Sequence, residues 1–235
     1  MCGRYALTPD REVIVDEFNT QLAGDLDHLR LAGRYNIAPT QAVAVIVPHR
    51  KGRLLTAMRW GILPQWVKPE EGGKPPAGWI NARGETAAEK PAFRGAFRYR
   101  RCLVPASGFY EWAKRDGSKQ PYYVRPADER LLAFAGLWET WTPPDGGELD
   151  TVTILTTEPN EMMSELHDRM PVVLDRADYN RWMTTPPEDA KSLTDLLTPA
   201  PEGTLEKIPV TRRVNSPKND DPACLERENG KLWDA

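Results

Sequence analysis

The chain contains 235 residues, of which 40% are hydrophobic and 28% are charged, and its formal net charge is −3. This composition is typical of a globular protein that buries a full core, and it excludes a disordered, collagen-like or coiled-coil chain. The apolar runs are far shorter than the ~20 residues of a membrane-spanning helix, so we expect no membrane partner.

The first predicted element is a helix that follows Thr8. Thr8 is suited to the N-cap and Pro9 to the first helical position, and Ile14, Phe18 and Leu22 recur at helical spacing. The pattern predicts a helix that packs against a sheet through this apolar stripe.

Strand signals dominate the middle of the chain, as short runs rich in β-branched and aromatic residues that end at Gly or Pro. They fall at residues 43–47, 54–60, 102–104, 109–112, 122–124, 131–137 and 151–156, with exposed loops expected at 72–76 and 143–147. Helical signals return at residues 160–166, at 176–183 with Asp175 as the cap, and at 188–197.

This irregular order of strands and helices predicts an α+β fold: one domain with a curved, largely antiparallel sheet or barrel-like core and flanking helices. We expect the domain to span residues 1–215. Residues 216–235 are then a C-terminal tail that packs on the domain or trails from it.

The charges are distributed unevenly. The first 125 residues hold eight more basic than acidic groups, and the rest holds eleven more acidic than basic groups. Either the two halves pair and cancel, or the first half forms a basic face. The excess of Arg over Lys, and the cluster of four arginines within residues 94–101, favour a face that binds phosphate, because guanidinium groups suit phosphate oxygens.

The three cysteines, Cys2, Cys102 and Cys224, form no C-x-x-C motif, and the three histidines form no zinc-binding pattern. We therefore expect no disulfide framework, no metal and no cofactor. The N-terminus has neither the basic nor the apolar segment of a signal peptide, which favours a cytoplasmic protein.

Cys2 is the most informative residue. Removal of Met1 is expected because a small residue follows it, and this leaves a cysteine whose α-amine and thiol are both free. Such a 1,2-aminothiol suits two reactions. The thiolate can attack an amide, or the amine can form an imine with an aldehyde that the thiol then closes to a thiazolidine. The third interpretation is that Cys2 is merely the second residue of the chain and takes part in no reaction.

Three further polar residues stand out. Glu111 lies between two aromatic residues, which desolvate a carboxyl and raise its pKa towards the range that general acid–base catalysis needs. A surface glutamate on an alternating strand is the alternative. His167 follows a short predicted helix, where a simple interaction with the helix C-terminus is the alternative, and Asn81 suits a turn equally well.

Eight motifs follow one another along the chain: MCGRYAL, RYNIAPTQ, RWGILPQW, WINARGET, RRCLVPASGFYEW, FAGLWETW, LHDRMPVVL and VTRRVN. Together they resemble the SOS response-associated peptidase (SRAP) family, the abasic-site processing proteins, from Cys2 to about Asn215. The resemblance implies a single α+β domain with a shallow basic groove for single-stranded DNA.

The resemblance also implies a DNA-damage function. Cys2, exposed at the N-terminus, attacks the ring-opened deoxyribose of an abasic site and forms a stable thiazolidine cross-link that shields the lesion. The peptidase activity is self-processing of the residue ahead of Cys2, and lyase-like Schiff-base chemistry allows slow reversal of the cross-link.

Roles for single residues follow from the same resemblance. Asn81 orients the N-terminal amine and the sugar, Glu111 is the acid and base, and His167 assists ring opening by proton transfer. Gly84 stands where the family often has alanine, away from this chemistry. The residues that the resemblance assigns to the DNA groove are Arg4, Asn36, Pro39, Trp66, Arg83, Thr156 and Arg169.

Two other hypotheses stay open. An N-terminal-nucleophile glutamine amidotransferase also begins Met-Cys-Gly, but it needs glutamine-pocket motifs and a synthetase domain that this sequence lacks. A non-catalytic reader of modified bases has no need of Cys2. We expect a monomer that is cytoplasmic, and nucleoid-associated when bound to DNA.

Overall fold

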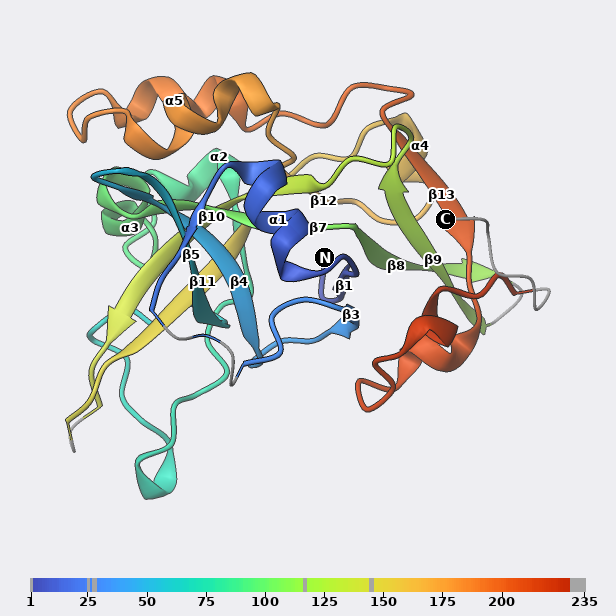
Figure 1. Cartoon of the computed structure of the whole chain (residues 1–235), viewed down its shortest axis with the longest axis horizontal. Coiled ribbons are helices and arrows are strands. Elements are labelled where there is room, and N and C mark those ends of the chain that lie inside the picture. Colours follow the sequence, from blue (N-terminus) through green and yellow to red (C-terminus); the bar gives the residue numbers. More distant parts are fainter. Residues whose placement is uncertain (1, 25, 27–28, 116–117, 144–145, 229–235) are drawn as a thin grey trace.

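A closed barrel of five strands forms the centre of the computed structural model, which describes residues 2–24, 26, 29–115, 118–143 and 146–228. The strands follow one another in the order β11 (Leu149–Thr157), β10 (Leu132–Trp141), β7 (Arg101–Ala106), β4 (Ala42–His49) and β5 (Gly52–Trp60). Neighbours are antiparallel except where β5 pairs with β11 in parallel and closes the ring. The α+β fold with a barrel-like core and flanking helices is confirmed (Figure 1).

A second, antiparallel sheet lies beside the barrel (Figure 1). Its order is β13 (Leu205–Pro209), β9 (Ser118–Pro126), β8 (Gly108–Arg115), β1 (Tyr5–Leu7) and β3 (Arg34–Ile37). The chain passes from the barrel into this sheet between β7 and β8. A Cβ on Gly108 at this junction would lie 2.5 Å from the carbonyl oxygen of Val124, so only glycine fits.

Three shorter strands join the barrel sheet: β2 (Gln21–Leu22), β6 (Asn81–Arg83) and β12 (Met170–Pro171). In the described part of the chain the helices are α1 (Arg11–Phe18), α2 (Gly84–Ala87), α3 (Arg94–Tyr99), α4 (Glu161–Ser164) and α5 (Tyr179–Thr184). The 3₁₀ segments are η1 (Glu71–Gly73), η2 (Arg176–Asp178), η3 (Ala190–Leu196), η4 (Arg212–Asn215) and η5 (Pro222–Leu225). Figure 1 shows α5 lying across the barrel, while the loop that carries η1 projects away from it. Among the described residues, no helix is long and apolar enough to cross a membrane.

Aromatic side chains join the two sheets into one core. Tyr5 on β1 packs edge-on against Trp60 and Phe134 of the barrel, with ring centroids 5.3 and 6.1 Å apart. Phe109 on β8 packs against Phe134 in the same way, at 6.0 Å. These buried contacts fix β1 at the junction of barrel and sheet, and therefore fix the residues just before it.

The observed helices differ from the prediction at the start of α1. Asp10 is the N-cap, not Thr8, because the Thr8 hydroxyl is engaged at 3.0 Å with the hydroxyl of Ser107. Ile14 and Phe18 are buried as expected, but Leu22 lies in β2 and is 40% exposed.

The later helical predictions hold in part. Asn160 and Asp175 cap α4 and η2 by accepting backbone N–H groups at 3.0 Å each, but residues 188–197 form mainly the 3₁₀ segment η3. All seven predicted strands are present, and most are longer than predicted, above all β9, while β10 is shifted towards the C-terminus. The strands β1, β2, β3, β6, β12 and β13 were not predicted because they are short. Of the loop expected at 143–147, residues 144 and 145 lie outside the described residues.

The C-terminal segment from residue 216 to 228 is packed against β3. The Asp220 carboxylate accepts from the backbone N–H groups of Tyr35 and Asn36 at 2.6 and 2.9 Å, and from Arg34 Nε. Cys224 and Leu225 of this segment are themselves buried. Asp220 therefore holds this segment against β3.

Candidate active site and nucleic-acid interface

Cys2 lies directly before β1, where the barrel meets the second sheet. Tyr5 on β1 pairs with Phe109 on β8, and the N–H of Tyr110 donates to the carbonyl oxygen of Arg4 at 3.0 Å. This antiparallel register leads the chain start towards Glu111. Asn81 on β6 holds it from the other side, since its Nδ2 donates to the Cys2 carbonyl oxygen at 2.9 Å.

The Cys2 side chain is fully buried, at 0% exposure, in the chain that includes Met1. Burial, reinforced by the nearby Glu111 carboxylate, raises the pKa of its thiol well above the ordinary range. The expectation of an exposed cysteine is therefore wrong for the full-length chain, because the thiol packs into the hydrophobic core. Met1 itself lies outside the described residues.

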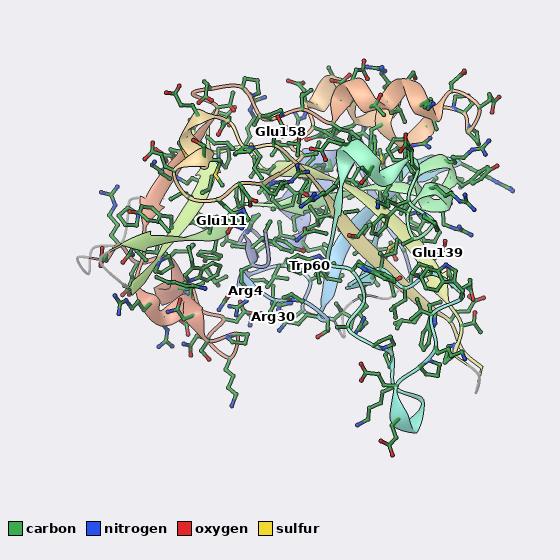
Figure 2. All side chains as sticks on the ribbon, turned by 180° about the vertical axis from the view of Figure 1, so that it is seen from behind. Arg4, Arg30, Trp60, Glu111, Glu139 and Glu158 are labelled. Atoms are coloured by element: carbon green, nitrogen blue, oxygen red, sulfur yellow. The ribbon has the colours of Figure 1, made fainter. Side chains whose placement is uncertain are left out.

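Glu111 lies in the middle of β8 and is only 3% exposed (Figure 2). Burial raises the pKa of its carboxyl, while the proximity of His167 acts in the opposite direction. The surface alternative is excluded, and the desolvated carboxyl expected from its aromatic neighbours is present. Such a group can hold a proton nearer to neutral pH than an ordinary glutamate.

Asn81 carries a second informative atom. Its Oδ1 is buried and has no hydrogen-bond partner among the described residues, although its Nδ2 is engaged with Cys2. A buried acceptor without a partner is costly, and sites that bind a ligand are where such atoms are tolerated. This oxygen is available to a donor at the N-terminus, and Asn81 lies in a strand, not in the turn that was the alternative.

Two surface hollows meet at His167. The first has a volume of about 370 Å³, and we call it the Lys119 hollow; its lining residues are Glu111, Trp112, Lys119, His167 and Asn215. The second has a volume of about 330 Å³, and we call it the Arg83 hollow; its lining residues are Asn81, Arg83, Thr156, His167, Asp168 and Arg169. Asn81, which donates to the Cys2 carbonyl, lines the Arg83 hollow, and Glu111, whose charge acts on the Cys2 thiol, lines the Lys119 hollow. The two residues therefore lie on opposite sides of His167, which both hollows share.

The residues predicted to bind DNA divide into two groups. Arg83 and Trp66 are exposed, and Arg83 makes no hydrogen bond or ion pair with any described residue, so its guanidinium is available to an anion. Trp66 is 62% exposed and lies 5.8 Å from Trp79, centroid to centroid. Pro39 is half-buried. Thr156 is almost fully buried and contributes mainly its carbonyl oxygen, which accepts from Arg169 at 2.6 Å.

Arg4 and Asn36 bind the protein itself. Asn36 is fully buried, and its Nδ2 donates to the carbonyl oxygens of Val214, Ser216 and Asn219 at 3.1, 3.0 and 2.7 Å. Arg4 Nη1 donates to Asn36 Oδ1 and to the Val214 carbonyl, both at 2.8 Å. Asn36 therefore has no surface to offer DNA in this conformation. Both side chains instead hold the C-terminal segment.

Arg169 forms a two-pronged ion pair with Glu85, a residue that the sequence did not single out. Arg169 Nη1 and Nη2 lie 2.6 and 2.7 Å from the two carboxylate oxygens. The Arg169 backbone N–H donates to His167 Nδ1 at 3.0 Å. The ion pair thus ties the loop that carries His167 to α2, and it neutralises a guanidinium that was expected to meet phosphate.

Glu85→Gln is expected to lower the free energy of unfolding by about 1 kcal/mol at neutral pH, because the pair is two-pronged but half-exposed. Arg169 lowers the pKa of Glu85 in the folded state. The stabilisation is therefore present above the ordinary Glu range and is lost as the pH falls through the lowered pKa. Urea denaturation of both proteins at pH 7 and pH 3 measures this. An equal difference at the two pH values contradicts it.

Other residues of the site were also missed. Trp112 Nε1 donates to Asn215 Oδ1 at 2.7 Å, which joins β8 to η4, and Lys119 lines the same hollow. Trp112 and Asn215 stood within motifs, but no local pattern says that two positions so far apart meet. No sequence signal marked Lys119. Among the described residues, no group of three or more His, Cys, Asp or Glu side chains is placed to hold a metal ion.

Comparison with known proteins decides the family. The family model described as SOS response associated peptidase (SRAP) matches residues 1–217. The chain belongs to the SRAP family. The expected resemblance is confirmed, and SRAP membership removes the support for a glutamine amidotransferase.

The SRAP relatives include proteins of similar length. The abasic site processing protein YoqW of Bacillus subtilis (strain 168) is 39% identical over 231 residues, which cover 96% of this chain and 99% of that protein. The abasic site processing protein HMCES of Gallus gallus is 37% identical over 194 residues, which cover 74% of this chain and 57% of that protein.

Solved structures share the SRAP fold seen here. A protein from Bacteroides thetaiotaomicron has a TM-score of 0.83 and 24% identity over 96% of this chain and 99% of its own. A protein from Bordetella bronchiseptica has a TM-score of 0.75 and 28% identity over 89% of this chain and 100% of its own.

Proposed function

We propose that this protein processes abasic sites in single-stranded DNA and links itself to them through a thiazolidine at Cys2. The observation that carries the proposal is the position of the buried Cys2 at the chain start, near Asn81, which lines one hollow, and Glu111, which lines the other. The similarity to YoqW, an abasic site processing protein, supports it.

Removal of Met1 is the first step. Hydrolysis of the Met1–Cys2 peptide bond consumes one water and frees the α-amine of Cys2. We propose that the carboxyl of Glu111, whose charge acts on the Cys2 thiol, moves the proton. The orphan Oδ1 of Asn81 then offers an acceptor to the new amine.

Formation of the cross-link requires the aldehyde form of the abasic sugar. We propose that His167, at the junction of the hollows, protonates the ring oxygen as the sugar opens. Arg83 binds an adjacent phosphate, because its guanidinium forms no ion pair with a described residue, and Trp66 offers an exposed ring on which a base can stack.

The cross-link forms through an imine and releases one water. The α-amine adds to the aldehyde carbon, and loss of one water, with Glu111 as proton donor, gives an imine. The Cys2 sulfur then adds to the imine carbon while the thiol proton passes, through Glu111, to the nitrogen. The product contains a five-membered thiazolidine ring. The mass of the adduct is that of protein plus DNA less one water.

The deciding experiment mixes purified protein with single-stranded DNA that carries one abasic site. We expect a band that resists denaturation, with the mass given above by intact-mass spectrometry and absent with undamaged DNA. Binding without any covalent product overturns the proposal and favours a non-catalytic reader of modified bases.

Arg83→Ala is expected to weaken the salt dependence of DNA binding. For single strands the log–log slope is about 0.7 per phosphate neutralised, so the slope should become shallower by up to that amount. Fluorescence anisotropy at several salt concentrations, on protein that also carries Cys2→Ala, measures it. Arg50→Ala is the control, because Arg50 is exposed in the turn between β4 and β5 and lines neither hollow. Equal slopes for both variants contradict the assignment.

A further inference from the structure

The Lys119 hollow contains a cation that the proposed chemistry does not use. Lys119 on β9 is exposed and forms no ion pair or hydrogen bond with any residue that the structure describes. The strand holds it firmly, since the next residue, Gln120, is buried and its Nε2 donates to the carbonyl oxygen of Val210 at 2.9 Å. The strand therefore fixes the backbone of Lys119, and its flexible side chain leaves the ammonium group available to an anion in this hollow.

A second donor lines the same hollow. The indole N–H of Trp112 donates to Oδ1 of Asn215, and because an indole can only donate, the amide oxygen must face it. The Nδ2 group of Asn215 is thereby fixed as the opposite end, and it has no partner among the described residues. Arg4, which donates to the Val214 carbonyl, holds the backbone beside it in place.

The two hollows, which meet at His167, contain the same kinds of side chain. Each is lined by His167, and each contains an exposed cation that forms no ion pair with a described residue, Arg83 in one and Lys119 in the other, although Glu85 attracts Arg83 electrostatically. Arg169 differs from both, because Glu85 already neutralises it. An extended polyanion that crosses the junction would meet one free cation in each hollow.

We infer that the Lys119 hollow is a second phosphate subsite, in which Lys119 and Asn215 bind the phosphodiester on the side of the abasic sugar away from Arg83. This inference rests on the proposed function. It places the reacting sugar between two anchored phosphates, so that the sugar is held from both ends above Cys2. Orientation from two ends is what brings reacting atoms together efficiently.

The test uses full-length protein that carries Cys2→Ala, and three single-stranded oligonucleotides with a tetrahydrofuran abasic analogue. One has normal phosphates, and the others have a neutral methylphosphonate directly 5′ or directly 3′ of the analogue. We expect each methylphosphonate to weaken binding. Lys119→Ala should remove the effect of one of them, and Arg83→Ala the effect of the other.

Salt dependence gives an independent measurement. Lys119→Ala should make the slope shallower by up to about 0.7, whereas Asn215→Ala should weaken binding without changing the slope, because an amide carries no charge. Lys51→Ala is the matched control, since Lys51 is exposed in the turn between β4 and β5 and lines neither hollow. Thermal unfolding checks that each variant is folded.

The outcomes separate the subsite from the proposed function. If wild-type protein cross-links the abasic strand but Lys119→Ala responds to both methylphosphonates as its parent does, the subsite is overturned and the proposed function stands. If wild-type protein forms no cross-link, both are overturned. If Lys51→Ala changes the slope as much as Lys119→Ala, the contact is diffuse electrostatic attraction and the subsite is again overturned.

Discussion

Cys2→Ser is expected to abolish the denaturation-resistant cross-link while leaving the α-amine in place. A hydroxyl is a far weaker nucleophile than a thiol, so the imine forms but the ring does not close. An imine hydrolyses readily, and borohydride reduces it to a stable amine. The variant should therefore give a stable product with borohydride only, whereas wild-type protein gives one without it.

A chain with an uncleavable extension before Cys2 is the matched control for the amine. It keeps the thiol but cannot form the imine, so no adduct is expected with or without borohydride. Because Cys2 is buried in the chain that includes Met1, mass spectrometry should first establish that the wild-type preparation has lost that residue. An extended chain that still attaches, or a wild-type adduct that needs borohydride, contradicts the thiazolidine.

Glu111→Gln is expected to slow the reaction strongly. The amide keeps the size of the side chain but cannot transfer a proton, and loss of a general acid or base costs about 10²- to 10⁴-fold in rate. Both Met1 removal and cross-link formation should slow. The pH–rate profile of wild-type protein should show a group that titrates above the ordinary Glu value of about 4.3, and the variant should lack it.

Although Glu111→Gln should slow the reaction, it is expected to stabilise the folded protein above neutral pH. Burial raises the pKa of Glu111, so its ionised form destabilises the folded state as the pH rises through that value. Glu111→Gln should therefore unfold at a higher temperature than wild-type protein at pH 8. The difference should vanish in acid, where the carboxyl is protonated in both states. A variant that is less stable and reacts at the wild-type rate shows that Glu111 is structural.

The sequence predicted the barrel strands well because each is a run of apolar, β-branched residues whose periodicity is local. It missed β1, β2, β3, β6, β12 and β13, which are two to five residues long and exist only through pairing with other strands. The start of α1 was missed for the same reason. The Thr8 hydroxyl contacts Ser107, which is distant in sequence, so Thr8 does not act as the N-cap that its propensity favours.

Residue chemistry was determined by the sequence alone. A cysteine behind the initiator methionine defines an aminothiol, and the motifs around Asn81, Glu111 and His167 identify the family that the comparisons confirm. These properties depend on covalent structure and on short stretches of neighbouring residues. They need no knowledge of what lies across the fold.

Burial and pairing were decided only by the tertiary structure. It buries Cys2 and Asn36, which the sequence placed at the surface, and it neutralises Arg169 with Glu85 while it leaves Arg83 free. It also brings Lys119 and Asn215 into one hollow. The physical reason is that solvation and charge pairing depend on which strands lie side by side, and long-range strand pairing is not encoded in any local pattern.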